Sequence, residues 1–323
     1  MPNRRTPLQL SLAALLTAGS LLISGCAADE EPILMPPAEL TRYVLDLSGS
    51  NDYMDQWEKL KPKIYSDLKS EALGNPYGEK PVGPKELSIT FITRNASQAK
   101  VIQISSAEFG SLLHEEIKSV YDRTSTQLIE DWPLVLATYR VALETSFADT
   151  SSCTQSTWNL LGTRLDDSDS KIIANRICVF AVSILNKLEI SIPATLSPGG
   201  GSDVFGSLRE IESWAKKLRE SNPKVKINVV FASDMVHNTG GKRDLFGNDG
   251  LLTGKIAQKE ICELANSQAV LSGLQLSNVS LEVIGRGNAS GVSGDEADAL
   301  AIFWNCFAEA SKLEINFSTD GSD

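Results

Sequence analysis

The sequence predicts an α/β domain with a mostly parallel central sheet, flanking helices and a helical insertion. Short apolar runs alternate with amphipathic stretches along most of the chain, which is the pattern of a parallel sheet covered by helices on both faces. Two of these runs are separated only by a turn around residues 95–97, so one strand is expected to be an antiparallel edge. The mostly helical stretch 109–192 is longer than one crossover connection needs, so we expect it to contain an insertion.

The elements follow from residue spacing. Apolar runs predict strands over 42–47, 87–93, 100–104, 225–232 and 279–284. Apolar residues at steps of three and four predict helices over 54–68, 112–121, 132–147, 172–188, 203–219, 255–274 and 295–312. Segments rich in Gly, Pro or polar residues are expected to be loops, at 74–84, 193–201 and 236–254. The last of these loops is expected to lie on the surface.

The N-terminus indicates export. Arg4 and Arg5 precede an apolar stretch, 8–23, in the order typical of a secretory signal. This stretch is interrupted by polar residues and is short for the roughly 20 apolar residues of a membrane span. Its end, Ile23-Ser24-Gly25-Cys26, resembles a bacterial lipobox. The resemblance implies cleavage before Cys26, lipidation of that residue, palmitate included, and an extracytoplasmic protein anchored to a bacterial cell membrane.

The chain is therefore divided into a signal peptide, a tether, one domain and a short tail. We expect these segments at 1–25, 26–39, 40–316 and 317–323. The tether is acidic and proline-containing, which is typical of a solvated linker.

Composition limits the class of protein. A hydrophobic content of 42% is enough for a sizeable core and argues against a disordered chain. The formal net charge of −11 would repel a polyphosphate, so we expect no nucleic-acid partner.

Export also bears on the cysteines. After lipidation of Cys26, an even number remains and no C-x-x-C pair is present, so two disulfides are expected in an oxidising compartment. The favoured pairing is Cys153 with Cys178 inside the insertion, and Cys262 with Cys306 between the last two long helices. Other pairings, and four free thiols, remain alternatives.

The residues that indicate chemistry begin at the end of the first strand, in Asp46-Leu-Ser48-Gly-Ser50. In open α/β sheets, ligands bind beyond the carboxyl ends of the strands. A carboxylate and two hydroxyls at alternate positions of a tight loop provide hard oxygen ligands, which suit Mg²⁺ or Mn²⁺.

At this point the chain resembles the von Willebrand factor A (VWFA) domain, whose metal-ion-dependent adhesion site (MIDAS) opens with D-x-S-x-S after the first strand. The family places a Thr in a second, glycine-rich loop before a helix, and an Asp after the next apolar strand. The matching residues here are Ser202, in Gly200-Gly-Ser-Asp203, and Asp234. Ser in place of Thr, and Met235 in place of a frequent Gly, are departures from the family pattern.

The resemblance implies a Rossmann-like fold in which strand 1 and strand 4 are neighbours, because the family's strand order reverses between them. It also implies a metal site formed by Asp46, Ser48, Ser50, Ser202 and Asp234. The three serines would bind the cation directly and the two aspartates directly or through water. A site with few direct anionic ligands leaves the cation electrophilic, so the expected partner is a protein that supplies a carboxylate.

Other sites are less well supported. A haloacid-dehalogenase-type phosphatase needs an Asp where Ser48 stands, and a P-loop needs Lys-Ser or Lys-Thr after its glycines. His114 is expected on a helix surface and His237 in an exposed loop, neither within a catalytic triad. The acids at 295–298 are expected to favour the dipole of the last helix.

The sequence thus predicts a non-enzymatic, lipid-anchored envelope protein that binds a divalent cation and uses it for protein–protein interaction or adhesion. The alternatives are a metal-assisted hydrolase, for which no general base or nucleophile is visible, and an envelope assembly factor with a vestigial metal site.

Overall fold

A computed structural model describes residues 38–48, 53–69, 74, 83, 85–98, 100–105, 125–148, 153–162, 167–195, 200–246, 250–255, 257–285 and 293–318. All described residues belong to one compact unit, Leu34–Asp323. The predicted signal peptide, lipidation site Cys26, helix 112–121 with His114, and Ser50 lie outside the described residues.

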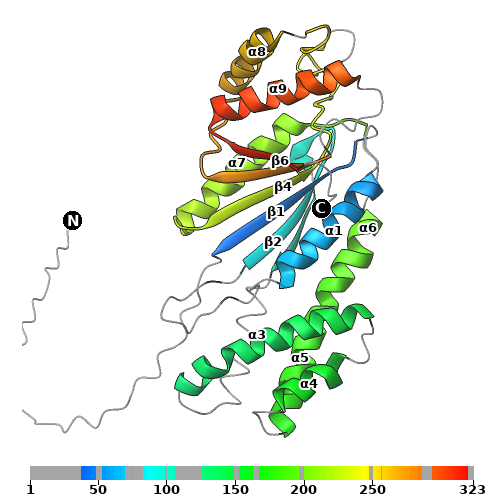
Figure 1. The fold of residues 1–323 in the computed structure, drawn as a ribbon, viewed down its shortest axis with the longest axis vertical. Coiled ribbons are helices and arrows are strands. Elements are labelled where there is room, and N and C mark those ends of the chain that lie inside the picture. Colours follow the sequence, from blue (N-terminus) through cyan, green and yellow to red (C-terminus); the bar gives the residue numbers. More distant parts are fainter. Residues whose placement is uncertain are drawn as a thin grey trace, which may run out of the picture. The chain divides into compact units, whose positions relative to one another are not determined.

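A six-stranded sheet forms the centre of the described fold (Figure 1). The strands are β1 (Glu39–Asp46), β2 (Lys85–Ile92), β3 (Val101–Ser105), β4 (Lys226–Ala232), β5 (Val279–Ile284) and β6 (Glu314–Ser318). Their order is β3-β2-β1-β4-β5-β6. Among the described strands, the β2–β3 pair is antiparallel and the other neighbouring pairs are parallel. The predicted α/β class, the mostly parallel sheet and the antiparallel edge strand are therefore confirmed.

β1 is a central strand whose two faces are both covered. Tyr43 and Leu45 pack into one buried apolar cluster, while Leu40 and Val44 pack into the other. This explains why β1 is a nearly continuous buried run rather than an alternating one, as is typical of parallel sheets.

Helices cover both faces of the sheet (Figure 1). α1 (Tyr53–Lys69) packs on one face, and its buried residues Trp57, Leu60 and Ile64 follow the predicted helical spacing. α7 (Val204–Ser221), α8 (Gln258–Ser272) and α9 (Gly294–Ser311) belong to the apolar cluster of the other face.

The insertion is a group of mutually packed helices. It contains α3 (Ser125–Ala148), α4 (Cys153–Leu161) and α5 (Asp167–Asn186), followed by a π-helical turn, η2 (Lys187–Ser191), and α6 (Ile192–Thr195). α4 lies in a polar stretch for which the sequence predicts no element. By length and composition, Ser168–Ala194 is the one helical stretch of the described residues that could cross a membrane, with 39% of its apolar window buried.

Contacts join this insertion to α1. Lys69 Nζ lies 3.1 Å from Glu144 Oε1 of α3, and Lys61 Nζ lies 2.8 Å from Glu189 Oε2 of η2. The insertion also belongs to the same apolar cluster as α1 and its face of the sheet.

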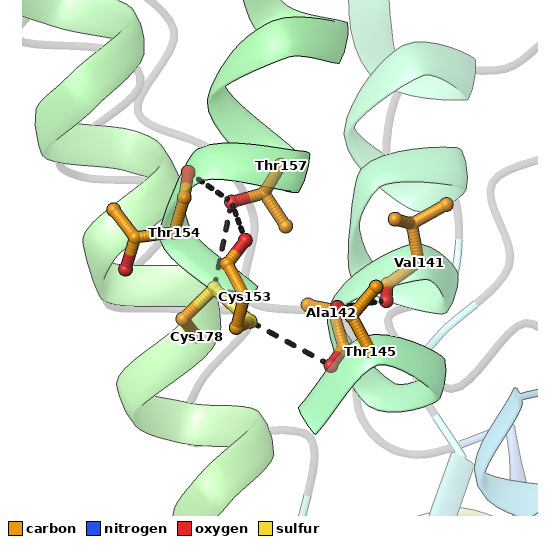
Figure 2. The surroundings of a disulfide bond; sticks show 7 residues. All are labelled: Val141, Ala142, Thr145, Cys153, Thr154, Thr157 and Cys178. Atoms are coloured by element: carbon orange, nitrogen blue, oxygen red, sulfur yellow. Dashed lines mark hydrogen bonds between the residues drawn. A yellow bond between two sulfur atoms is a disulfide. The ribbon is translucent and has the colours of Figure 1, made fainter. Parts of the chain in front are cut away.

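Two disulfides are present, and both have the predicted partners. Cys153–Cys178 joins α4 to α5, and Cys262–Cys306 joins α8 to α9. Figure 2 shows the first bond between helices, with the Thr157 hydroxyl 3.4 Å from Cys178 Sγ. Thr157 Oγ1 lies 2.9 Å from the Cys153 carbonyl oxygen, to which it donates, so the threonine ties the disulfide to its own helix.

The last strand, β6, was not predicted from the sequence, whereas the acidic start of α9 was. β6 is not indicated by the sequence pattern, yet it pairs in parallel with β5. Asp295 and Glu296 lie in the first turn of α9 as expected, and Glu296 also forms a capping box that was not predicted: its side chain accepts from Ser293 N at 2.8 Å, and Ser293 Oγ accepts from Glu296 N at 3.4 Å.

Candidate functional site

The candidate site lies where the strand order reverses. β1 and β4 are parallel neighbours, with Leu45 opposite Ala232, and β2 lies on the other side of β1. The loops that leave β1 and β4 therefore start side by side at one edge of the sheet. This is the position at which open α/β sheets bind ligands.

Asp46, the last residue of β1, joins three segments of the chain at this edge. Its Oδ1 accepts from Ser48 N at 2.9 Å. Its Oδ2 accepts from Ser202 Oγ at 2.9 Å and from Ser233 Oγ at 2.7 Å. The two motifs that the sequence placed 156 residues apart are therefore in direct contact.

The Asp46 carboxylate is fully buried, with an exposed fraction of 0%. Burial raises the pKa of Asp46, and the hydrogen bonds from Ser233, Ser48 and Ser202 act in the opposite direction. Asp46 forms no ion pair with any described residue. Because buried charges in proteins are normally paired or bound to a metal, this carboxylate needs a proton or a cation that the described side chains do not supply.

Ser202 is held in place by its backbone. Its N–H donates to Asn238 O at 2.7 Å and its carbonyl accepts from Asn238 N at 2.9 Å. Gly201 permits this pairing, because a Cβ at position 201 would stand 2.4 Å from Asn238 O. Asp203 then caps α7, accepting from Gly206 N at 2.9 Å. The Gly-Gly-Ser-Asp stretch is thus a turn that fixes the Ser202 hydroxyl and starts the helix.

Asp234 follows β4 and is also fully buried. Its Oδ1 accepts from Val236 N at 2.8 Å, across Met235, which has φ of 62°. A left-handed conformation is unfavourable for a residue with a Cβ. The Met235 side chain is buried, and its carbonyl oxygen accepts a hydrogen bond from Trp304 Nε1 at 2.9 Å.

The described residues of the predicted metal site all lie at one edge of the sheet, but they differ in how each is related to Asp46. Asp46 and Ser202 are hydrogen-bonded, Ser48 is buried beside Asp46, and Asp234 is the residue after Ser233. Sequence reasoning missed Ser233, although its place before Asp234 at the end of the most apolar strand was a usable signal.

Predictions for the segment after β4 were wrong in part. His237 is only 4% exposed rather than an exposed loop residue, and its ring packs on Phe205 with centroids 4.7 Å apart. Burial lowers the pKa of His237, against the opposing field of Asp203, whose Oδ1 lies 3.8 Å from His237 Nδ1. Leu245 and Leu252 are buried as well, because these apolar side chains join the cluster beneath α7 to α9 and hold the loop to the domain.

No group of three or more His, Cys, Asp or Glu side chains that could hold a metal ion occurs among the described residues. A thiolate, imidazole or carboxylate-rich centre is therefore not formed by this part of the chain. The arrangement around Asp46 is of another kind, with a single buried carboxylate surrounded by hydroxyl groups.

Comparison with known proteins adds little to this description. The chain matches no protein-family model and no curated protein. Among solved structures, it is similar to proximal thread matrix protein 1 from the mussel byssus, with 10% sequence identity and a TM-score of 0.27. That alignment covers 85% of this chain and 48% of the mussel chain, so this chain spans about half of that protein. A likeness of this degree carries no argument about function.

Proposed function

We propose that the chain is a VWFA-like, lipid-anchored envelope protein that binds Mg²⁺ or Mn²⁺ beside Asp46 and uses the cation to bind a carboxylate of a partner protein. The observation that carries the proposal is the hydrogen bond from Ser202 Oγ to Asp46 Oδ2. The family resemblance required these two residues to meet, although they are far apart in the sequence. The β1–β4 pairing that the resemblance also required supports it further.

The donors suit a hard cation. Ser202 and Ser48 both direct hydroxyl hydrogen bonds at Asp46. A hydroxyl that donates its proton in this way keeps its oxygen lone pairs for a second interaction. Asp46 would therefore act as a positioning group that orients two neutral oxygens and supplies negative charge behind them. Neutral oxygens and retained waters are what Mg²⁺ accepts in near-octahedral sites.

Asp234 would add a second carboxylate at the end of β4. Asp46 and Asp234 would be the two anions of the site, and Asp46 already accepts hydrogen bonds from hydroxyl groups. The positive charge of the cation would therefore be only partly neutralised, so the cation would still attract a carboxylate of a partner. This is a binding function, and it needs no general base or nucleophile.

The test is calorimetric titration of the full-length, detergent-solubilised protein with Mg²⁺ and with Mn²⁺. We expect binding by the wild type and none by Asp46→Ala. Asp298→Ala is a matched control, because it removes an exposed carboxylate from α9. Absence of binding by the wild type up to millimolar metal, or unchanged binding by Asp46→Ala, would reject the proposal and favour a structural role for the Asp46 hydrogen bonds.

A further inference from the structure

Four cations lie on or beside the segments that carry the Ser202–Asn238 pairing, in a protein that is acidic as a whole. We call them the basic rim, and they are Arg94, Arg209, Lys242 and Arg243. Arg94, Arg209 and Lys242 are exposed and Arg243 is half-buried. Within the described part of the chain, none of the four lies in a salt bridge with a carboxylate.

Contacts place Arg94 beside the candidate site. Arg94 follows β2, and its Nε donates to Thr239 O at 3.3 Å. Its guanidinium also lies against Gly240, where an added Cβ would stand 3.2 Å from Nη2. Since Asn238, the residue before Thr239, pairs with the backbone of Ser202, Arg94 borders the turn that holds the Ser202 hydroxyl.

Lys242 and Arg243 lie in the same small loop. The loop is closed by Asp244, whose carboxylate accepts from Thr239 N at 2.8 Å, Gly240 N at 2.9 Å and Gly241 N at 3.1 Å. Desolvation raises the pKa of Asp244, but these N–H groups together outweigh it and lower the pKa. The Asp244 carboxylate is thus bound to the loop backbone, and among the described residues no salt bridge joins it to Lys242 or Arg243.

Arg209 and Arg243 both act on the charge of His237. Burial is the largest cause of the lowered pKa of His237; the charges of Asp203 and Asp244 raise this pKa, and the weaker effects of Arg243 and Arg209 lower it. The fields of a residue on α7 and a residue in the loop therefore overlap at His237, three residues after Asp234. The acids nearby, Asp203 and Asp244, both accept backbone N–H groups.

We propose that the basic rim is a docking surface for an acidic segment of a partner protein. Several carboxylates of the segment would face the basic rim, and this docking does not depend on the proposed function. One further carboxylate would reach the cation beside Asp46, and that contact rests on the proposed function. The net charge of the protein is −11, so cations without a salt bridge make the surface locally positive where the rest is negative. Charges at the edge of an interface govern the association rate and the choice of partner. A polyphosphate is a poorer fit, because the rest of the surface repels an extended polyanion.

The experiment measures fluorescence anisotropy of a labelled poly-glutamate peptide with the full-length, detergent-solubilised protein, in Mg²⁺ and in EDTA. Lys242→Glu/Arg243→Glu should weaken binding by about tenfold at low salt, since two attractions become repulsions. The difference should shrink as salt rises, because the Debye length falls from about 10 Å at 0.1 M to about 3 Å at 1 M. Arg209→Glu, on a different element, should weaken binding in the same direction.

The matched control is Lys216→Glu/Lys217→Glu, which makes the same charge change on exposed residues of α7 about two turns beyond Arg209. It should leave the peptide affinity unchanged. Calorimetry with Mg²⁺ alone separates the two proposals, because reversing rim cations should strengthen metal binding while it weakens peptide binding.

Absence of peptide binding by the wild type, equal loss in the control and rim variants, or tighter rim-dependent binding of an oligothymidylate than of the peptide would overturn the assignment. Rim-dependent binding that is the same in Mg²⁺ and EDTA would support the docking surface and count against the metal-mediated contact.

Discussion

Ser202 and Ser233 donate hydrogen bonds to the same oxygen of Asp46, but only Ser202 is a predicted metal ligand. This pair allows the structural and the metal-binding roles of the site to be separated. The perturbation is Ser202→Ala, compared with Ser233→Ala as a matched change in the same buried cluster. Both replacements remove one hydroxyl and leave the backbone unchanged.

The loss of stability follows from the contacts. At a pH above the raised pKa of Asp46, where the carboxylate is ionised, removing a hydrogen bond to it costs about 1.5–3 kcal/mol. Ser202→Ala loses one such bond, at 2.9 Å. Ser233→Ala loses the bond to Asp46 at 2.7 Å and also the acceptor for Met235 N at 2.9 Å, so it should cost at least as much. A loss of about 2 kcal/mol corresponds to a midpoint lower by about 4–8 °C in a domain of this size.

The assay combines urea unfolding in EDTA with Mg²⁺ calorimetry on both variants. We expect both to be destabilised, but only Ser202→Ala to lose Mg²⁺ binding. If Ser233→Ala, the less stable variant, keeps its Mg²⁺ affinity within a few-fold, instability cannot explain the loss in Ser202→Ala. Equal Mg²⁺ affinities of the two variants, or a change in stability below about 0.5 kcal/mol in Ser202→Ala, would refute the reasoning.

Three further predictions concern pH, the insertion and the anchor. Because burial raises the pKa of Asp46 above its usual 3.8, its contribution to stability is complete below 3.8 and is lost as pH rises through the raised value. The metal-free protein should therefore gain stability on mild acidification, and urea unfolding should show a gain that Asp46→Ala lacks; identical pH profiles would contradict this. Replacing Cys153 and Cys178 by Ala opens a bond between residues 25 apart, which should cost about 3.5 kcal/mol by the chain-entropy relation. A denaturation midpoint equal to that of the wild type would argue against this estimate. Cys26→Ser should abolish lipidation and release the protein from membranes or leave the precursor uncleaved, and normal processing with wild-type fractionation would disprove the lipobox interpretation.

Local patterns were sufficient for much of the fold. The apolar runs and helical spacings identify β1, β4, β5, α1, α7, α8 and α9 because burial on a strand or helix imposes a period that survives in the sequence. The disulfide partners were predictable for a related reason. Cys262 and Cys306 lie on helices that follow successive strands of one sheet, and such helices pack together.

Elements whose signal is weak were not predictable. β6 is short and only partly buried, so its residues show no strict alternation, and its existence depends on the free edge of β5. α4 is largely polar in sequence, and its buried side, with Cys153 and Thr157, is defined by the neighbouring helices α3 and α5.

The candidate site shows the same division. The sequence alone placed Asp46 and Asp234 at strand ends and Ser202 in the turn before a helix, because Gly, Ser and Asp in these places are local signals. The sharing of Asp46 by Ser202 and Ser233 depends on the tertiary fold, since these contacts join residues 156 and 187 positions apart. The tertiary fold also decided that His237 would be buried, because its loop packs against α7 rather than extending into solvent. Side-chain contacts between distant segments depend on the parallel pairing of β1 and β4, and that pairing leaves no periodic trace in either segment alone.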